Sequence, residues 1–217
     1  MILAGCVHQI SGLVSNCYLI EEPDGLTLID TGMPGAEKKV LALIARLGRT
    51  PAELSRILIT HGDGDHIGAL NVLMAVSGAT VSASEHEANA IRQGIPSRPL
   101  SPQGAGQKLV YALLGNFIKP QPAVVDEILT PGQTLPILEG LQVLDTRGHT
   151  PGHLSYYLPE KRILFAGDSI KGSAARPLPS SGANNWDSVL SQRSFEAQLA
   201  LKPAWICAGH DLIHLDE

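Results

Sequence analysis

Apolar and polar residues along this chain follow two different periodicities. Short apolar runs rich in β-branched and aliphatic residues, typical of buried strands, occur at 14–20, 26–29, 56–60, 79–83, 125–129, 133–138, 141–145, 154–158, 162–166 and 204–208. Between them, apolar positions spaced near 3.6 residues predict helices at 37–47, 67–76 and 187–201. The alternation of strand, helix and strand predicts an α/β fold.

The segment 84–124 differs in character from the rest of the chain. Two polar, helix-like pieces at 84–93 and 107–118 flank a loop at 94–102 that contains three prolines. An insertion beside a site loop can form a lid or a substrate-binding wall, and it can equally be a surface excursion without a role. The sequence leaves both interpretations open.

Composition narrows the classes of protein to which the chain can belong. Its 217 residues suffice for one core, and no linker rich in Pro, Gly or Ser divides them. A formal charge of −5 and few aromatic residues argue against a nucleic-acid partner. No apolar stretch approaches the length of a membrane span, and the start does not resemble a signal peptide. We therefore expect a single cytoplasmic domain, residues 1–217, that acts on a small molecule.

The cysteines do not suggest a disulfide framework. Cys6, Cys17 and Cys207 are odd in number and lack Cys-x-x-Cys spacing. We expect them to be small buried apolar residues.

The densest chemistry lies directly after the apolar run 56–60. Two imidazoles and two carboxylates, separated by glycines, occur within six residues: His61, Asp63, Asp65 and His66. Any one of these groups alone is commonly a turn residue that bonds its own backbone. Packed together, however, they would repel or desolvate one another unless a cation held them. The segment therefore predicts a metal site in a loop at the C-terminal end of a strand.

Three further strands end in the same way. The run 141–145 leads to His149 and His153, the run 162–166 to Asp168, and the run 204–208 to His210. Each group follows an apolar strand and lies beside or near a glycine. We expect these loops to converge with the first one on one edge of the sheet.

In this order, the motifs resemble those of the metallo-β-lactamase-fold superfamily of metal-dependent hydrolases. The resemblance covers nearly the whole chain and rests on the segments 16–20, 30–32, 60–68, 148–153, 167–168 and 209–210. It implies a four-layer αββα sandwich with a two-metal site along one edge. By position, it assigns His61, Asp63 and His149 to the first metal and Asp65, His66 and His210 to the second, with Asp168 bridging the two. His153 has no matching ligand role, and we expect it to support the site or line its pocket.

The chain departs from the family pattern at one position. The family motif is His-x-His-x-Asp-His, whereas this chain has a carboxylate, Asp63, in place of the second histidine. A carboxylate oxygen and an imidazole Nδ1 lie equally many bonds from Cβ, so Asp63 can reach the same metal. The added negative charge weakens both metals as Lewis acids and makes Mn or Fe more competitive with Zn, which the family favours.

The resemblance implies hydrolysis of an ester, lactone, thioester or related bond by a water held between the two metals. Asp65 would orient that water or pass its proton to the leaving group. Two alternatives remain open. The flavodiiron branch of the superfamily also has a carboxylate at the position of Asp63 and uses two irons for oxygen or nitric oxide reduction. The chain can also be a structural or sensing module with a vestigial site.

The substrate class is only partly bounded. We expect no glutathione-binding extension after His210, no RNA-processing domains and no secreted β-lactamase, which leaves a lactonase-like or general small-molecule hydrolase. The candidate substrate contacts are Arg98, Lys108, Tyr111, Phe117, Arg176 and His153. Each of them, taken alone, is more often an ordinary surface or packing residue. Relatives pair through this region, so a homodimer is possible.

Overall fold

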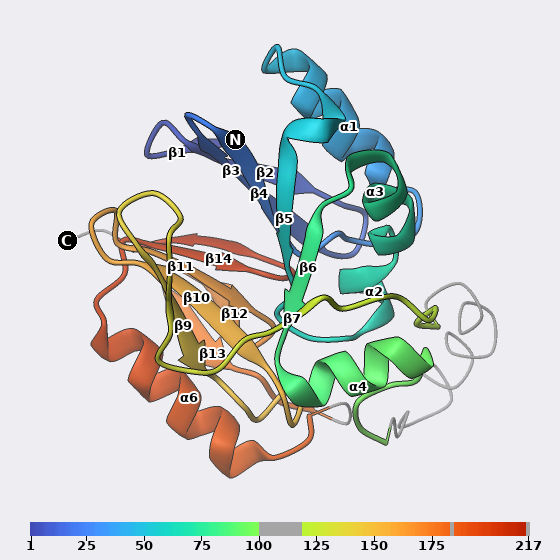
Figure 1. Cartoon of the computed structure of the whole chain (residues 1–217). Coiled ribbons are helices and arrows are strands. Elements are labelled where there is room, and N and C mark those ends of the chain that lie inside the picture. Colours follow the sequence, from blue (N-terminus) through green and yellow to red (C-terminus); the bar gives the residue numbers. More distant parts are fainter. Residues whose placement is uncertain (100–118, 183–184, 216–217) are drawn as a thin grey trace.

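The computed structural model describes residues 1–99, 119–182 and 185–215 (Figure 1). Two sheets pack face to face, and helices cover their outer faces, with α1 and α3 on one side and α6 on the other. The expected four-layer αββα sandwich of the α/β class is thus confirmed. The helices are α1 (Glu37–Arg46), the 3-10 helix η1 (Pro51–Glu53), α2 (Gly64–Ile67), α3 (Leu70–Ser77), α4 (Glu85–Gln93) and α6 (Ser188–Ala200).

The first sheet follows the order of the chain. Its strands are β1 (Ile2–Leu3), β2 (Val7–Ser11), β3 (Asn16–Glu22), β4 (Gly25–Ile29), β5 (Leu54–Leu58), β6 (Thr80–Ala83) and β7 (Glu127–Ile128). Neighbours from β1 to β4 are antiparallel, whereas β4 to β7 are parallel. The C-terminal ends of the parallel strands therefore meet at one edge, where the metal-binding motif begins.

The second sheet has the order β15-β14-β11-β10-β9-β8. Its strands are β8 (Thr134–Leu135), β9 (Leu141–Asp145), β10 (Leu154–Leu158), β11 (Ile163–Gly167), β14 (Trp205–Ala208) and β15 (Leu212–His214). Only the pair of β11 and β14 is parallel among the described pairs of this sheet. A separate hairpin joins β12 (Ile170–Ser173) and β13 (Arg176–Pro179).

The strands are apolar on both faces because each sheet lies between two layers. In β3, Tyr18 and Ile20 pack into the core between the sheets, whereas Cys17 and Leu19 pack toward the helices. In β10, Tyr156 faces the other sheet and Tyr157 faces the outer core under α6. A strand buried on both faces gives a continuous apolar run, which explains the pattern seen in the sequence.

Several predicted elements are shorter or divided. The run 67–76 forms parts of two helices, because Gly68 interrupts the turn and donates its N–H to the carbonyl of Gly32 at 2.8 Å. A Cβ on Gly68 would lie 2.3 Å from Pro34, so only glycine allows this approach. The run 133–138 keeps only a two-residue strand, since Leu138 has φ +50° and turns the chain. The predicted helix 107–118 lies outside the described residues.

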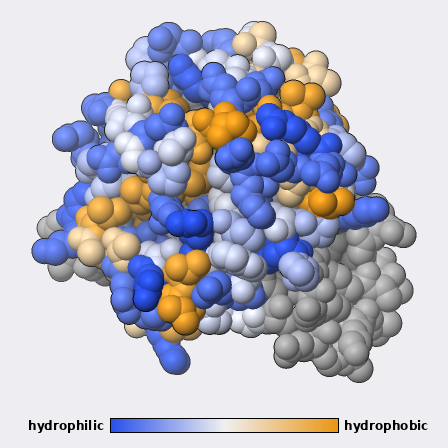
Figure 2. Space-filling model, turned by 60° about the horizontal axis from the view of Figure 1, so that its bottom comes forward, coloured by the Kyte–Doolittle hydropathy of each residue, from blue (hydrophilic) through white to orange (hydrophobic). Residues whose placement is uncertain are grey.

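One face of the molecule is shown in Figure 2. Apolar groups there stand in separate spots among polar side chains. Among the described residues, no helix has the length and apolar character needed to cross a membrane.

Candidate metal centre

The structure brings all of the predicted metal ligands together where the two sheets meet. His61 and Asp63 lie in the loop after β5, and Asp65 and His66 lie on the short helix α2. The second sheet contributes three ligands from the loops after β9, β11 and β14: His149, Asp168 and His210. The backbone N–H of Leu154 donates to the carbonyl of Thr60 at 2.9 Å and ties the two sets of loops together.

The candidate ligands lie in the two groups that were predicted from the sequence. In the first, Asp63 Oδ2 lies 3.5 Å from His61 Nε2 and 3.4 Å from His149 Nε2. In the second, Asp65 Oδ2 lies 3.8 Å from both His66 Nε2 and His210 Nε2. Each group offers three donor atoms within 4.8 Å of one another, which is a spacing that one cation can span.

Asp168 lies between the two groups. Its Oδ1 is 3.2 Å from His66 Nε2, and its Oδ2 is 3.0 Å from His210 Nε2 and 3.6 Å from His149 Nε2. It therefore contacts histidines of both groups, as a bridging carboxylate would.

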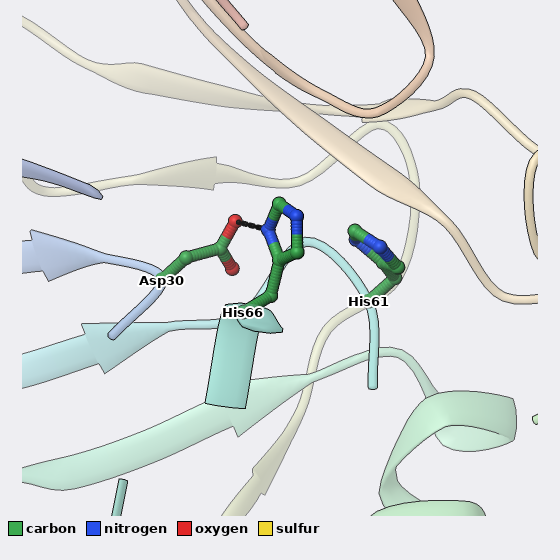
Figure 3. Close-up of side chains that lie close together, drawn as sticks. All are labelled: Asp30, His61 and His66. Carbon is green, nitrogen blue, oxygen red and sulfur yellow. Dashed lines mark hydrogen bonds and ion pairs between the residues drawn. The ribbon is translucent and has the colours of Figure 1, made fainter. Parts of the chain in front are cut away.

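The imidazoles are held with Nε2 facing inward. His66 Nδ1 bonds Asp30 Oδ2 at 2.9 Å, and in Figure 3 the Asp30 carboxylate faces this ring while His61 stands on its far side. The other Nδ1 atoms bond the hydroxyl of Thr60, the hydroxyl of Ser180 and the carbonyl of Val14, for His61, His149 and His210 respectively. Such outer bonds fix the tautomer and leave the Nε2 lone pair for a metal.

Buried atoms that lack a hydrogen bond show that a cation fits. His61 Nε2, His66 Nε2 and Asp168 Oδ1 are buried and make no well-oriented hydrogen bond, although His66 Nε2 and Asp168 Oδ1 face each other as an ion pair at 3.2 Å. Buried polar atoms in folded proteins are nearly always bonded, so three such atoms within one cluster call for a ligand. Nitrogen and carboxylate oxygen donors suit a divalent cation such as Zn, Mn or Fe.

Glycines make this close approach possible. A Cβ on Gly209 would lie 2.1 Å from Asp168 Oδ1 and 2.6 Å from His66 Cε1. A side chain there would push the second sheet away from α2. Packing therefore requires a glycine at position 209.

The cluster keeps two of its carboxylates, Asp63 and Asp168, ionised. Burial pushes the pKa of Asp168 upward, but His66, His210 and His149 outweigh it and hold that pKa well below its usual range. Burial likewise acts on Asp63, where bonds with His149, His61 and Arg98 hold the pKa well below normal. The hydrogen bond with Asp168 raises the pKa of His210 to about 9. These groups form the anionic donor set that a metal requires.

Arg98 joins the first group. Its Nη1 and Nη2 donate to the two oxygens of Asp63 at 2.7 and 2.8 Å, and Nη2 also lies 3.1 Å from His149 Nε2. The sequence suggested Arg98 as a substrate contact, which stays a prediction, whereas the structure places its guanidinium on Asp63. A carboxylate that replaces an imidazole in a buried cluster needs a positive partner.

The remaining predicted contacts are placed as follows. His153 is fully buried, where Nδ1 bonds the Thr146 hydroxyl at 2.8 Å and Nε2 accepts the N–H of Asp168 at 3.1 Å. It thereby holds the turn that carries the bridging carboxylate, and burial lowers its pKa well below normal. Arg176 is exposed in the β12–β13 hairpin. Lys108, Tyr111 and Phe117 lie outside the described residues.

Sequence reasoning missed one further residue, Glu87 of α4. Its Oε2 accepts the N–H of Gly62 at 2.8 Å and its Oε1 accepts the N–H of Gly152 at 3.1 Å, and the residue is fully buried. It joins the loop of the first sheet to the loop of the second. The sequence signal, a glutamate in a polar helical segment, is indistinguishable from that of a surface residue.

Comparison with known proteins agrees with this geometry. The chain is 29% identical over 210 residues to the uncharacterized protein YobT of Bacillus subtilis, covering 90% of this chain and 82% of that one. It is 29% identical over 167 residues to the hydroxyacylglutathione hydrolase GloC of Haemophilus influenzae, covering 76% and 70%. A solved structure of a Cronobacter sakazakii metallo-beta-lactamase with a HARLDQ motif superposes with a TM-score of 0.73 at 25% identity, covering 97% of this chain and 77% of that one.

The family model described as the metallo-beta-lactamase superfamily matches residues 10–210. That span includes every ligand described above, from the loop after β5 to His210. This chain belongs to the metallo-beta-lactamase superfamily.

Proposed function

We propose that this protein is a metal-dependent hydrolase that cleaves an ester, lactone or thioester bond in a small molecule. The observation that supports this most directly is the set of three buried donor atoms, on His61, His66 and Asp168, that lack a hydrogen bond. They point into a cluster where carboxylates and inward-facing imidazoles are already fixed by outer hydrogen bonds. Such preorganisation is what a catalytic metal site needs.

In this proposal His61, Asp63 and His149 hold the first of two divalent ions, and Asp65, His66 and His210 hold the second, with Asp168 between them. When bound, the ions supply an acidic water and a Lewis acid for the carbonyl of the substrate. Asp65 lies in the first turn of α2 and is partly exposed, so its carboxylate can accept the proton of the nucleophile and deliver it to the leaving group.

Zn is the ion that the family suggests, and Mn or Fe is plausible because Asp63 adds an oxygen donor. The relative GloC is a hydroxyacylglutathione hydrolase, and because an acyl group on the glutathione thiol is a thioester, this similarity supports including thioesters in the substrate class. The proposal also includes a lactonase-like activity, a cytoplasmic location, and a homodimer without nucleic-acid or membrane partners.

The test combines elemental analysis with hydrolysis assays. Purified protein is loaded separately with Zn, Mn and Fe and is assayed on an ester, a lactone, a hydroxyacyl thioester and a phosphodiester. We expect metal-dependent cleavage of a carbonyl substrate, and loss of both metal and activity in His61→Ala. His214→Ala serves as a control, because this exposed histidine stacks on Trp205 and not on the cluster.

Three results would contradict the proposal. Metal-replete protein that cleaves none of the four substrates would exclude hydrolysis of these bond types. Bound iron with an oxidised chromophore, together with no hydrolysis, would favour the di-iron redox alternative. Unchanged metal content in His61→Ala would remove the first group from the site.

A further inference from the structure

The lone pair of His149 Nε2 faces a competitor for metal. A neutral imidazole has one donor nitrogen and one acceptor nitrogen. His149 Nε2 lies 3.1 Å from Arg98 Nη2, which can only donate, and 3.4 Å from Asp63 Oδ2, which can only accept. The shorter contact, to Arg98, favours Nε2 as the acceptor. Nδ1 is therefore protonated and donates to Ser180 Oγ at 2.9 Å. The single lone pair that a first metal would need on His149 is thus directed at Arg98.

Asp63 is engaged by the same side chain. Both of its carboxylate oxygens accept hydrogen bonds from Arg98, in the bidentate geometry that makes such pairs strong. A carboxylate oxygen has a second lone pair, so this contact alone does not exclude a metal. The positive charge does oppose one, because two cations a few ångströms apart in a buried site repel each other strongly.

The second group faces carboxylates and not a guanidinium in its described contacts. His66 Nε2 and His210 Nε2 lie 3.2 and 3.0 Å from the two oxygens of Asp168, so a metal there competes with protons and not with a fixed cation. The outer atom of His66, Nδ1, is held on Asp30 as metal ligands usually are. In the first group, Arg98 engages both His149 and Asp63.

We propose that Arg98 competes with the first metal, so that the second site fills first and the first site fills only when the guanidinium leaves His149. The inference rests on the proposed metal-dependent function. It makes Arg98 a positioning residue that sets how many ions the protein holds at a given metal concentration. Because Arg98 lies in the segment that follows α4, withdrawal of this side chain would couple occupancy of the first site to the segment 94–99.

A metal titration without substrate tests the competition. Metal-free, full-length protein is titrated with Co(II), and the visible absorption bands report each site as it fills. For the wild-type protein we expect two steps whose affinities differ by about 10-fold or more. In Arg98→Gln the affinity of the weaker site should rise by about 10-fold or more, which brings the two steps together. Arg46→Gln, an exposed arginine in the last turn of α1, should behave as the wild type does.

Two results would refute the competition between Arg98 and the first metal. If Arg98 instead supports Asp63 as a ligand, Arg98→Gln will lower the affinity of the first site, and the competition is refuted. Two equal steps in the wild-type protein refute it as well, even if Arg98→Gln fails to fold. The double variant Asp63→His with Arg98→Gln rebuilds the family motif without a buried unpaired carboxylate, and we expect it to bind two ions in closely spaced steps.

The titration also separates this inference from the proposed function. Protein that binds no Co(II) at all would contradict the metal-dependent hydrolase. Protein that binds two equivalents with equal affinity would contradict only the competition by Arg98.

Discussion

Asp30 shows how a single buried carboxylate outside the ligand set shapes the site. Its Oδ1 accepts the N–H of Thr60 at 2.8 Å, and its Oδ2 accepts the Thr60 hydroxyl at 2.7 Å and meets His66 Nδ1 at 2.9 Å. The residue has φ +55°, a left-handed conformation that is uncommon outside glycine and asparagine or aspartate. The strained turn after β4 therefore places the Asp30 carboxylate against His66, a histidine of the second group.

Replacing this carboxylate by an amide should weaken metal binding. In Asp30→Asn only one side-chain oxygen remains to accept, so either Thr60 or His66 loses its partner. We expect the affinity of the second site to fall about 10- to 100-fold. Competition of the loaded protein against a chelator measures this change. Asp24→Asn, in the exposed turn between β3 and β4, is the control, and equal affinities in the two variants would show that Asp30 does not act on the metal.

At the scale of the element, α4 acts as a clamp on the two ligand loops. Glu87 reaches the backbone N–H of Gly62 and of Gly152, which are 25 and 65 residues away along the chain. Ser84 caps the helix by accepting the N–H of Glu87, which sets the position of this side chain. The helix therefore positions the ligands without binding metal.

Glu87→Gln tests this clamp. The glutamine has one oxygen where the glutamate has two, so one buried N–H is left unpaired and faces another donor. We expect the free energy of unfolding to fall by about 1–3 kcal/mol. Urea unfolding of the metal-free protein measures it, which separates the effect from metal binding. Glu85 lies two residues before Glu87 on the same helix and is exposed, so Glu85→Gln should change stability by only a few tenths of a kcal/mol. Equal losses would argue against a specific role of Glu87.

The elements also show what a sequence can predict. Strands buried on both faces, such as β10 (Leu154–Leu158), were predicted at their observed bounds because the apolar run is continuous. The strand at 125–129 shrank to two residues, since its pairing with β6 covers only that length. Local patterns specify which residues can form a strand, whereas the neighbouring strand decides how many of them pair.

In the site, too, features encoded by residues close together in the sequence were predictable, whereas contacts between distant residues were not. The convergence of the candidate ligands was predictable because motifs within a few residues place these side chains at strand ends. The contacts of Arg98 with Asp63, 35 residues apart, and of Glu87 with Gly152 depend on how the segment after β6 folds over the loops. No local pattern encodes these contacts, so they required the structure.

At the scale of the whole molecule, the site joins two halves. The first sheet and α2 supply His61, Asp63, Asp65 and His66, and the second sheet supplies the other ligands. Two further hydrogen bonds cross between the sheets: Tyr18 Oη donates to the carbonyl of Ala208 at 2.7 Å, and Tyr156 Oη donates to that of Ile59 at 2.8 Å. A bound ion adds a cross-link at the open edge, so metal binding and global stability are coupled.

Removal of metal should therefore make stability depend on pH in a way that the loaded protein lacks. In the metal-free protein, Asp168 raises the pKa of His210 to about 9. A raised pKa means that the folded state favours the protonated form. This stabilisation is present in full below about pH 6.5, the ordinary histidine value, and is lost as the pH rises through 9. Because the His210 side chain is 40% exposed, solvent screening limits the effect to about 1 kcal/mol.

Urea unfolding at pH 6, 7.5 and 9 measures this dependence. We expect the free energy of unfolding of chelator-treated protein to fall across the series, and the decline to be shallower in His210→Gln. It does not vanish there, because Asp168 and Asp65 overcome burial to raise the pKa of His66 as well. In metal-loaded protein the ion takes the Nε2 lone pairs of both histidines, so no proton is available to exchange and the decline should disappear. An equal decline with and without metal would show that these histidines do not bind the ion.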